Sequence, residues 1–293
     1  LSLLALLNIV LAVGLINNAS FFSQAVDRVV LLQELKAFSD VTGRPPLSTS
    51  VYIFPSRRSP ISLQNAEEIS QHITSTLSGE VGLPVRLSVT QVSSGSMMLQ
   101  PPPGSQMFEE GKTFLGNVEV GYIQNVADQM EITEGVPLDE DGASKDALEV
   151  WLTESMAQTM GANIGEELRM GISMTGSSIP VRLAGFWRPV DPESDFWFND
   201  PRSSFKSTFL VRRSDYIQYV QPMVSSGTGE ASWYVILDET KITPRDGKKY
   251  LDGFERANIL ISKFLPGARM NTPPLDPLTK FVGRSSALTI LLL

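Results

Sequence analysis

The chain has 293 residues, the length of roughly two ordinary domains. Its 24 Lys and Arg residues against 32 Asp and Glu residues give a net charge of −8, and an acidic chain without a basic stripe is unsuited to nucleic acid. Cysteine is absent and His72 is the only histidine, which excludes disulfides, cysteine nucleophiles, thiolate metal sites and multi-histidine metal sites.

Both ends of the chain are apolar. Leu1–Ile16 contains only Ser2 and Asn8 as polar residues, and Ala287–Leu293 is similar. A bilayer-crossing helix needs about 20 apolar residues, so we interpret each run as part of a longer transmembrane helix. A signal peptide and an ordinary buried helix are the alternatives for the first run. The signal peptide is disfavoured because no basic segment precedes the run. Two membrane-bound ends place the acidic middle outside the cell.

Helices are predicted where apolar residues recur every three or four positions. The first apolar run continues without Gly or Pro to Phe38, and Thr42-Gly43-Arg44-Pro45-Pro46 ends the helix. Further helices are predicted after Ser59-Pro60 up to Gly82, from a Thr153 cap to Gly161, at Asp215–Val220, and from Thr243-Pro244 to Pro266-Gly267.

Strands are predicted where apolar and polar residues alternate or short apolar runs occur. They are Val51–Phe54, Pro84–Val92, Asn117–Val126, a short strand from Met130, Ala147–Leu152, Glu166–Ser173, Ser178–Trp187, Ser207–Val211 and Ser232–Asp238. Ser93–Gly111 is rich in Ser, Pro and Gly and is predicted to be a loop, and Asp191–Ser204 a polar and aromatic loop. This mixture predicts an α+β fold.

One stretch carries a family pattern of a strand, a short helix, two glycine turns and two further strands. Thr153-Glu154-Ser155 with Ala157 begins the helix and Met160-Gly161 ends it. Gly165-Glu166-Glu167 makes the next turn, and Ala184-Gly185 ends the later strand. This pattern resembles the ectodomain of ABC transporter permeases of the FtsX/MacB type, where the motifs are SE-x-x-A, LG-x-x-x-GD and V-x-G.

The resemblance implies a domain plan. Residues 1–38 would be the end of transmembrane helix 1 and its outward extension, and residues 282–293 the start of transmembrane helix 2. A larger α+β extracytoplasmic subdomain of βαβ type would comprise 39–130 plus 205–281. Residues 131–204 would form an inserted β-rich, barrel-like subdomain.

The resemblance also implies a role. Such a domain transmits ATPase-driven motion to an exported substrate or envelope partner. The expected partners are a cytoplasmic ABC ATPase subunit, a second permease copy and the lipid bilayer, with the domain outside the cell membrane. No catalytic, cofactor or metal residue is expected. An extracellular ligand-sensing domain of a two-helix membrane receptor is the alternative, and a membrane-anchored hydrolase using His72 is disfavoured by the poverty of histidine and cysteine.

The roles of three residue groups remain open. Asp191, Glu193 and Asp195 alternate and would offer oxygens to Ca²⁺, but they lack the Gly and distal Glu of an EF-hand, so an acidic solvated loop is favoured. Met97-Met98-Leu99 would serve either as an exposed partner contact or as packing on the domain's own core. For the aromatic group Trp187, Phe196, Trp197 and Phe198, packing is favoured over a ligand cage.

Overall fold

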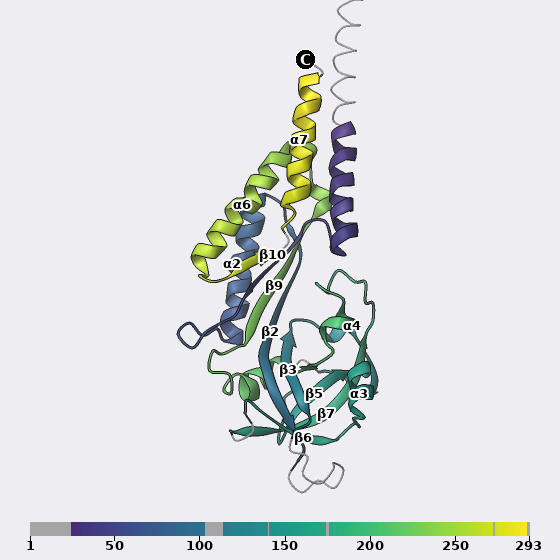
Figure 1. The fold of residues 1–293 in the computed structure, drawn as a ribbon, viewed down its shortest axis with the longest axis vertical. Coiled ribbons are helices and arrows are strands. Elements are labelled where there is room, and N and C mark those ends of the chain that lie inside the picture. The colour runs from purple at the N-terminus through teal and green to yellow at the C-terminus, as the bar shows by residue number, and fades with distance from the viewer. Residues whose placement is uncertain (1–24, 103–113, 140, 174–175, 272, 292–293) are drawn as a thin grey trace, which may run out of the picture.

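The computed structural model describes residues 25–102, 114–139, 141–173, 176–271 and 273–291. Within them, helices and strands combine around one mixed sheet, which confirms the predicted α+β class (Figure 1). The strands are β1 (Ser48–Ile53), β2 (Val85–Gln100), β3 (Gly116–Ile123), β4 (Met130–Gly135), β5 (Leu148–Thr153), β6 (Glu167–Gly171), β7 (Ser178–Pro189), β8 (Thr208–Leu210), β9 (Glu230–Leu237) and β10 (Arg269–Asn271). The helices are the N-terminal helix (residues 25–42), α2 (Leu63–Val81), α3 (Glu154–Met160), α4 (Pro201–Ser204), α5 (Arg213–Asp215), α6 (Gly247–Phe264) and α7 (Leu275–Leu291).

The sheet closes on itself at one end of the molecule. Its order is β10-β1-β9-β2-β3-β8-β5-β7-β4, and β6 pairs with both β2 and β7. Six of the described strands, β2, β3, β8, β5, β7 and β6, therefore form a barrel, while β9, β1 and β10 extend from β2 as an open sheet. In Figure 1 the barrel lies at one end of the elongated molecule and α6, α7 and the N-terminal helix at the other.

Strand β2 belongs to both parts. Val85–Ser93 pairs antiparallel with β9, and Met98–Gln100 pairs with β6 in the barrel. Between Ser93 and Ser96 the register with β3 shifts, and Gly95 there has a φ of 71°. A bulge bends a strand and increases its twist, so this break turns β2 from the open sheet into the barrel.

The continuation of β2 corrects the predicted loop at Ser93–Gly111. The strand stays extended to Gln100, and the Ser- and Gly-rich composition belongs to the bulge rather than to a loop. Met97 and Leu99 are buried in the main hydrophobic core, so the packing alternative is confirmed for these two residues. Residues 103–111 lie outside the described residues.

Glycines end the first helices where the sequence predicts. Gly43, Gly82 and Gly161 have φ values of 66°, 79° and 66°, a left-handed conformation that glycine adopts without a steric penalty. The predicted cap is also confirmed, since the Thr153 side chain accepts a hydrogen bond from the Met156 amide at 3.3 Å.

Two details differ from the prediction. Helix α2 begins at Leu63 rather than at Ser59-Pro60, because Ser62 is the residue whose hydroxyl accepts from the Asn65 amide (3.0 Å) and caps the helix. Strand β10 was not predicted. It has only three residues, so it carries no pattern of alternating apolar and polar side chains. Its extended form comes from pairing with β1.

Helices α2 and α6 cover one face of the open sheet. Trp233 of β9 points to this side, where its Nε1 donates to the Ala66 carbonyl of α2 at 2.7 Å. Because side chains alternate along a strand, every second residue faces the helices and the others face away. The helix-facing residues are buried and include Val51, Val92, Trp233, Val235 and Leu237.

The N-terminal helix and α7 lie side by side, and the start of the first and the end of the second lie at the same end of the molecule (Figure 1). Glu34 of the N-terminal helix forms an ion pair with Arg284 of α7. Both helices also contribute to the main buried core, through Leu31, Leu35, Leu278 and Phe281.

None of the described helices is long and apolar enough to cross a bilayer. The predicted membrane segment Leu1–Ile16 lies outside the described residues. Within the predicted segment 282–293, the backbone is helical to Leu291 as part of α7. The transmembrane assignment of the two ends stays a prediction.

The predicted boundary between 39–130 plus 205–281 and the insert 131–204 stays a prediction too. Pairing of β2 with β6 and of β5 with β8 crosses it, so the barrel takes strands from both predicted subdomains.

Gly253 tests the contact between α2 and α6. A Cβ at this position would lie 2.6 Å from the Glu80 carbonyl oxygen and 2.7 Å from the Val81 Cα. Gly253→Ala should therefore lower the free energy of unfolding by about 1–3 kcal/mol through overpacking. Gly79→Ala is the control, because nothing lies within 4 Å of its Cβ and Ala favours a helix interior by about 0.5–1 kcal/mol. Urea unfolding checks both, and equal effects would contradict the close approach.

Candidate functional site

A cavity lies on the face of the open sheet opposite α2 and α6. Its floor comes from β1, β9 and β2, whose neighbouring residues stand in register across the three strands. The alternation that buries Trp233 under the helices turns the residues on either side of it toward this cavity. The floor consists of two rows, Ser50, Tyr234 and Val89 in one, and Tyr52, Ser232 and Gln91 in the other.

Residues 191–205, called the roof loop below, cover this floor. Trp197 stacks on the buried Trp187 at 6.0 Å between ring centroids, and its Nε1 donates to the Asp191 carbonyl at 3.1 Å. Phe198 meets the floor residue Tyr234 at 4.5 Å. Packing is therefore the role of Trp187, whereas Trp197 and Phe198 pack and line the cavity at once.

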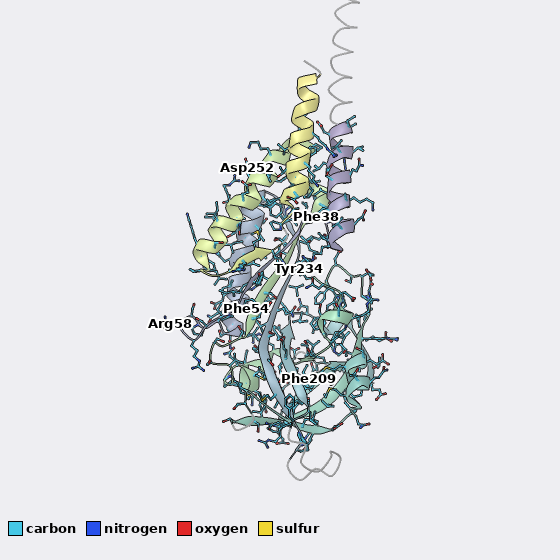
Figure 2. All side chains as sticks on the ribbon, viewed as in Figure 1. Phe38, Phe54, Arg58, Phe209, Tyr234 and Asp252 are labelled. Atoms are coloured by element: carbon cyan, nitrogen blue, oxygen red, sulfur yellow. The ribbon has the colours of Figure 1, made fainter. Side chains whose placement is uncertain are left out.

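The cavity has a volume of about 280 Å³, and its lining combines aromatic rings with polar side chains. Its aromatic residues come from the floor strands and the roof loop, and include Tyr52, Phe54, Phe196, Trp197, Phe198 and Tyr234. Tyr234 and Phe54 lie at the level where the helical end of the molecule meets the barrel end (Figure 2). Small-molecule sites have this character, with apolar walls and a few polar groups that fix orientation.

Glu230 is the charged residue among those that line the cavity. Burial raises the pKa of its carboxyl group, and the nearby carboxylate of Glu119 raises this pKa further. Both residues flank β2, Glu230 opposite Ser93 and Glu119 opposite Ser96. Within the described part of the chain, neither carboxylate has a Lys or Arg at ion-pair distance, so the Glu230 carboxylate has no direct counterion.

Two arginines attach the roof loop to the helical end. The Arg44 guanidinium, just after the N-terminal helix, lies 3.8 Å from the ring centroid of Phe198, and its Nη2 donates to Asn199 Oδ1 at 2.7 Å. Burial lowers the pKa of Arg44. Arg86 of β2 pairs with Asp195 at 2.7 Å. The roof loop is thus anchored from the opposite half of the molecule.

The acidic residues of the roof loop do not converge on one point. Asp195 pairs with Arg86, and Glu193 with Arg202 at 3.3 Å. The Asp191 carboxylate accepts from the Glu193 amide at 3.0 Å, as in a local turn. Among the described residues no group of three His, Asp or Glu side chains is arranged to hold a metal ion. The candidate Ca²⁺ ligands are therefore engaged in turn and ion-pair contacts.

His72 lies on the exposed side of α2. Its ring stacks on Phe264 of α6, with centroids 3.8 Å apart and planes 30° from parallel. We therefore interpret His72 as a packing residue between α2 and α6.

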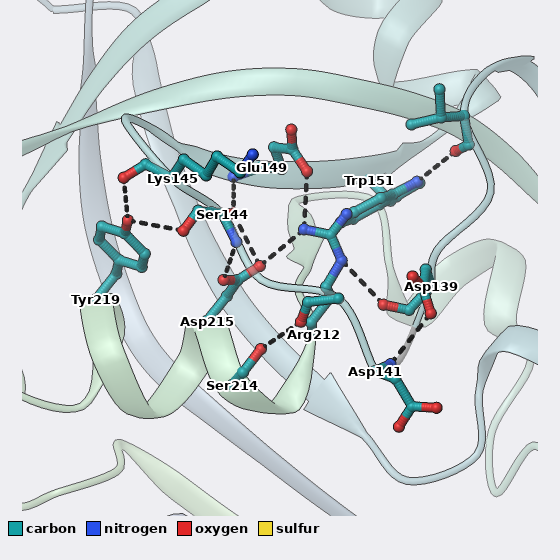
Figure 3. Close-up of polar contacts among 12 residues, drawn as sticks. Asp139, Asp141, Ser144, Lys145, Glu149, Trp151, Arg212, Ser214, Asp215 and Tyr219 are labelled. Carbon is teal, nitrogen blue, oxygen red and sulfur yellow. Dashed lines mark hydrogen bonds and ion pairs between the residues drawn. The ribbon is translucent and has the colours of Figure 1, made fainter.

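A second polar cluster is internal (Figure 3). Asp215 is completely buried, and its carboxylate accepts from the amide and hydroxyl of Ser144 at 2.7 and 2.8 Å. Arg212 Nη1 pairs with Asp215 at 3.1 Å and with Glu149 at 2.7 Å. Arg212 Nε donates to the Asp139 carbonyl at 2.9 Å.

This cluster holds the acidic segment before β5 against the turn after β8. The Arg212 guanidinium lies 4.7 Å from a ring centroid of Trp151, whose Nε1 donates to the Val136 carbonyl at 2.8 Å. The Tyr219 hydroxyl donates to the Lys145 carbonyl at 3.0 Å. Because both oxygens of Asp215 already have donors from the chain, we interpret the cluster as a structural clamp.

The sequence pattern indicates only part of the cavity lining. Phe196, Trp197 and Phe198 stand out as an aromatic group, but Glu230 and Tyr234 do not. The available signal was the alternation Glu230, Ser232, Tyr234 along β9, which places these three side chains on one face. Only pairing with β1 and β2 reveals that this face meets the roof loop.

No family model matches the sequence, and no curated protein matches it. Among solved structures, a domain of a protein described as a permease from Porphyromonas gingivalis is similar to this chain. The two are 15% identical with a TM-score of 0.38, over 78% of this chain and 90% of that domain. This likeness to a permease domain is too distant to assign a function by itself.

Arg212 tests the clamp. Arg212→Met leaves Asp215 buried without its cation and should lower the free energy of unfolding by about 3–5 kcal/mol. The control is Arg182→Met, which breaks an exposed pair with Glu167 and should cost less than about 1 kcal/mol. Both are measured by denaturant unfolding. A loss at Arg212 no larger than at Arg182 would show that the clamp contributes little.

Substitution of Glu230 tests the charge of the cavity. The folded-state pKa of Glu230 is raised above the ordinary 4.5, so the unfolded chain loses this proton first and stability falls as the pH rises from about 4.5 through the raised value. Glu230→Gln should therefore raise the free energy of unfolding at about pH 7, and this gain should disappear near pH 4. Unfolding curves at both pH values measure it, and a loss at pH 7 would contradict the burial of an unpaired carboxylate.

Proposed function

We propose that this chain contains the extracytoplasmic domain of an FtsX/MacB-like ABC transporter permease, which transmits ATPase-driven motion to an exported substrate or envelope partner. The observation that carries the proposal is the pairing of the N-terminal helix with α7 at one end of the molecule, with the barrel at the other (Figure 1). The two helices run antiparallel, and the start of the N-terminal helix and the end of α7 lie at the same end of the molecule, as required if both chain ends enter one membrane face (Figure 1). The sequence resemblance at Thr153–Gly185 supports the same role.

A continuous path for displacement supports this mechanical role. The N-terminal helix ends at residue 42, and β1 begins at Ser48, so the helix joins the sheet through a short segment. Arg44 within that segment holds Phe198 and Asn199 of the roof loop. A shift of the helix along its axis therefore reaches the sheet through the chain and the roof loop through Arg44.

Strand β2 supports transmission over a longer range. It is a single extended element that starts under the helical layer and ends inside the barrel. Its hydrogen bonds to β9, β3 and β6 resist stretching, so the helical end and the barrel cannot move apart without breaking them.

The Glu34–Arg284 ion pair bears on how the two helices move. Glu34 is nearly buried between the helices, whereas Arg284 is mostly exposed. The pair joins the N-terminal helix to α7 in this conformation, but an ion pair with one exposed partner contributes only about 0–1 kcal/mol, so it permits the two helices to shift against each other. In this proposal the ATPase subunit, a second permease copy and the bilayer are the partners, and the domain lies outside the cell membrane without a catalytic step.

The cavity favours a second candidate, an extracellular ligand-sensing domain of a two-helix membrane receptor. Its aromatic walls and single carboxylate suit a small ligand. In a receptor, ligand binding would shift the paired helices, whereas in a permease nucleotide turnover would shift them.

Spin labels on the paired helices distinguish the two roles. The 293 residues contain no cysteine, so Lys36→Cys and Lys280→Cys, both at exposed positions, place one label on each paired helix, and any cysteine elsewhere in the full-length protein is replaced by serine. In the full-length protein with its ATPase in lipid nanodiscs, we expect the distance distribution to change between nucleotide-free and vanadate-trapped states. The measurement is pulsed electron paramagnetic resonance.

Single-label variants serve as controls, because they report distances between two copies alone. An ATPase that cannot hydrolyse ATP should leave the distribution in its nucleotide-bound form. Identical distributions in all nucleotide states would contradict the permease proposal, and a change caused by a ligand alone would favour the receptor.

A further inference from the structure

We infer that the cavity between the floor strands and the roof loop binds a small organic cation, a protonated amine carried on an apolar or aromatic body. This inference goes beyond the proposed function, because it concerns the occupant of the cavity and holds for a permease or a receptor alike.

The first argument for a cationic ligand is the charge of the cavity. Glu230 supplies a carboxylate to a lining that is otherwise uncharged, and Glu119 lies close enough to add to its field. A partly buried carboxylate without a counterion is costly, and a bound cation removes that cost. Beside Glu230 this charge disfavours phosphates and carboxylates, whereas Arg44 and Arg86 act on the floor residue Tyr234, so we expect the cation at the Glu230 end of the cavity.

The second argument for a cationic ligand is the set of aromatic rings in the lining. Cations are attracted to the faces of aromatic rings, more strongly where water is excluded. The roof loop already makes such a contact, since the Arg44 guanidinium lies 3.8 Å from the ring centroid of Phe198. Tyr52 and Phe54 form an edge-to-face pair at 5.8 Å, and Phe54 is largely exposed, so an incoming ligand would meet its ring.

The size of the cavity limits the ligand. A volume of about 280 Å³ lies just below the roughly 300–1,000 Å³ of sites for drug-sized molecules. A single ring with a short amine chain therefore suits it better than a polymer or a lipid. Gln91 and Ser232 on the floor supply neutral hydrogen-bonding groups beside the charge.

The binding test uses three probes of similar shape and different charge. Phenethylammonium is the cation, 2-phenylethanol the neutral analogue and 3-phenylpropionate the anion. They are titrated by calorimetry and by tryptophan fluorescence into the full-length protein in nanodiscs. We expect the ammonium compound to bind most tightly and the carboxylate least, and we expect the affinity for the amine to fall as the pH falls and Glu230 takes up a proton.

Two variants test the residues. Glu230→Gln should weaken binding of the amine about tenfold to a hundredfold, as expected for loss of a charge-assisted hydrogen bond, and should leave the alcohol unchanged. Phe54→Leu keeps an apolar side chain but removes the ring, so it should weaken the amine more than the alcohol. Glu255→Gln on the exposed side of α6 removes the same charge elsewhere and should leave all three probes unchanged.

The inference is overturned if the carboxylate probe binds as tightly as the amine, or if Glu230→Gln and Glu255→Gln bind the amine equally. Absence of any saturable amine signal up to about 10 mM would overturn it as well. Thermal unfolding of each variant checks that the cavity is still folded. None of these outcomes depends on an ATPase, so they are distinct from the failure of the permease proposal.

Discussion

The architecture depends on one strand, β2, that is shared between the open part of the sheet and the barrel. β2 pairs with β9 in the open sheet, then passes a bulge at Gly95 and pairs with β3 and β6 in the barrel. Gly229, next to β9, approaches this bulge closely, and its amide donates to the Ser93 carbonyl at 2.7 Å. A Cβ at Gly229 would lie 2.4 Å from the Gly95 amide nitrogen, so a larger residue there would push β9 and β2 apart at the point where β2 turns into the barrel.

The cavity is a consequence of this junction. The open sheet has α2 and α6 on one face, and its other face would be exposed to water if the barrel were absent. The bend of β2 brings the barrel and its roof loop over that second face, but the loop does not fill the space. Aromatic rings from both sides line the gap, and Glu230 among them has no Lys or Arg at ion-pair distance within the described residues.

The roof loop joins the cavity to the paired helices at the other end. Arg44 contacts Phe198 and Asn199 at the point where the N-terminal helix gives way to β1. A helix movement that displaces Arg44 would therefore act on the roof loop, and a ligand that shifts Phe198 would act back on Arg44. Reciprocity of this kind follows from thermodynamic linkage, in which two events that share a contact influence each other equally.

Local chemistry by itself determined the helix ends at Gly43, Gly82 and Gly161, the Thr153 cap and the mixed α+β class, because φ preferences, capping and periodicity act within a few residues. It also marked the aromatic residues of the roof loop. Tertiary structure decided that β2 runs through its bulge into the barrel, that β10 exists, and that Glu230 and Tyr234 face the roof loop. These features depend on pairing between strands far apart in the chain, which a local pattern does not encode.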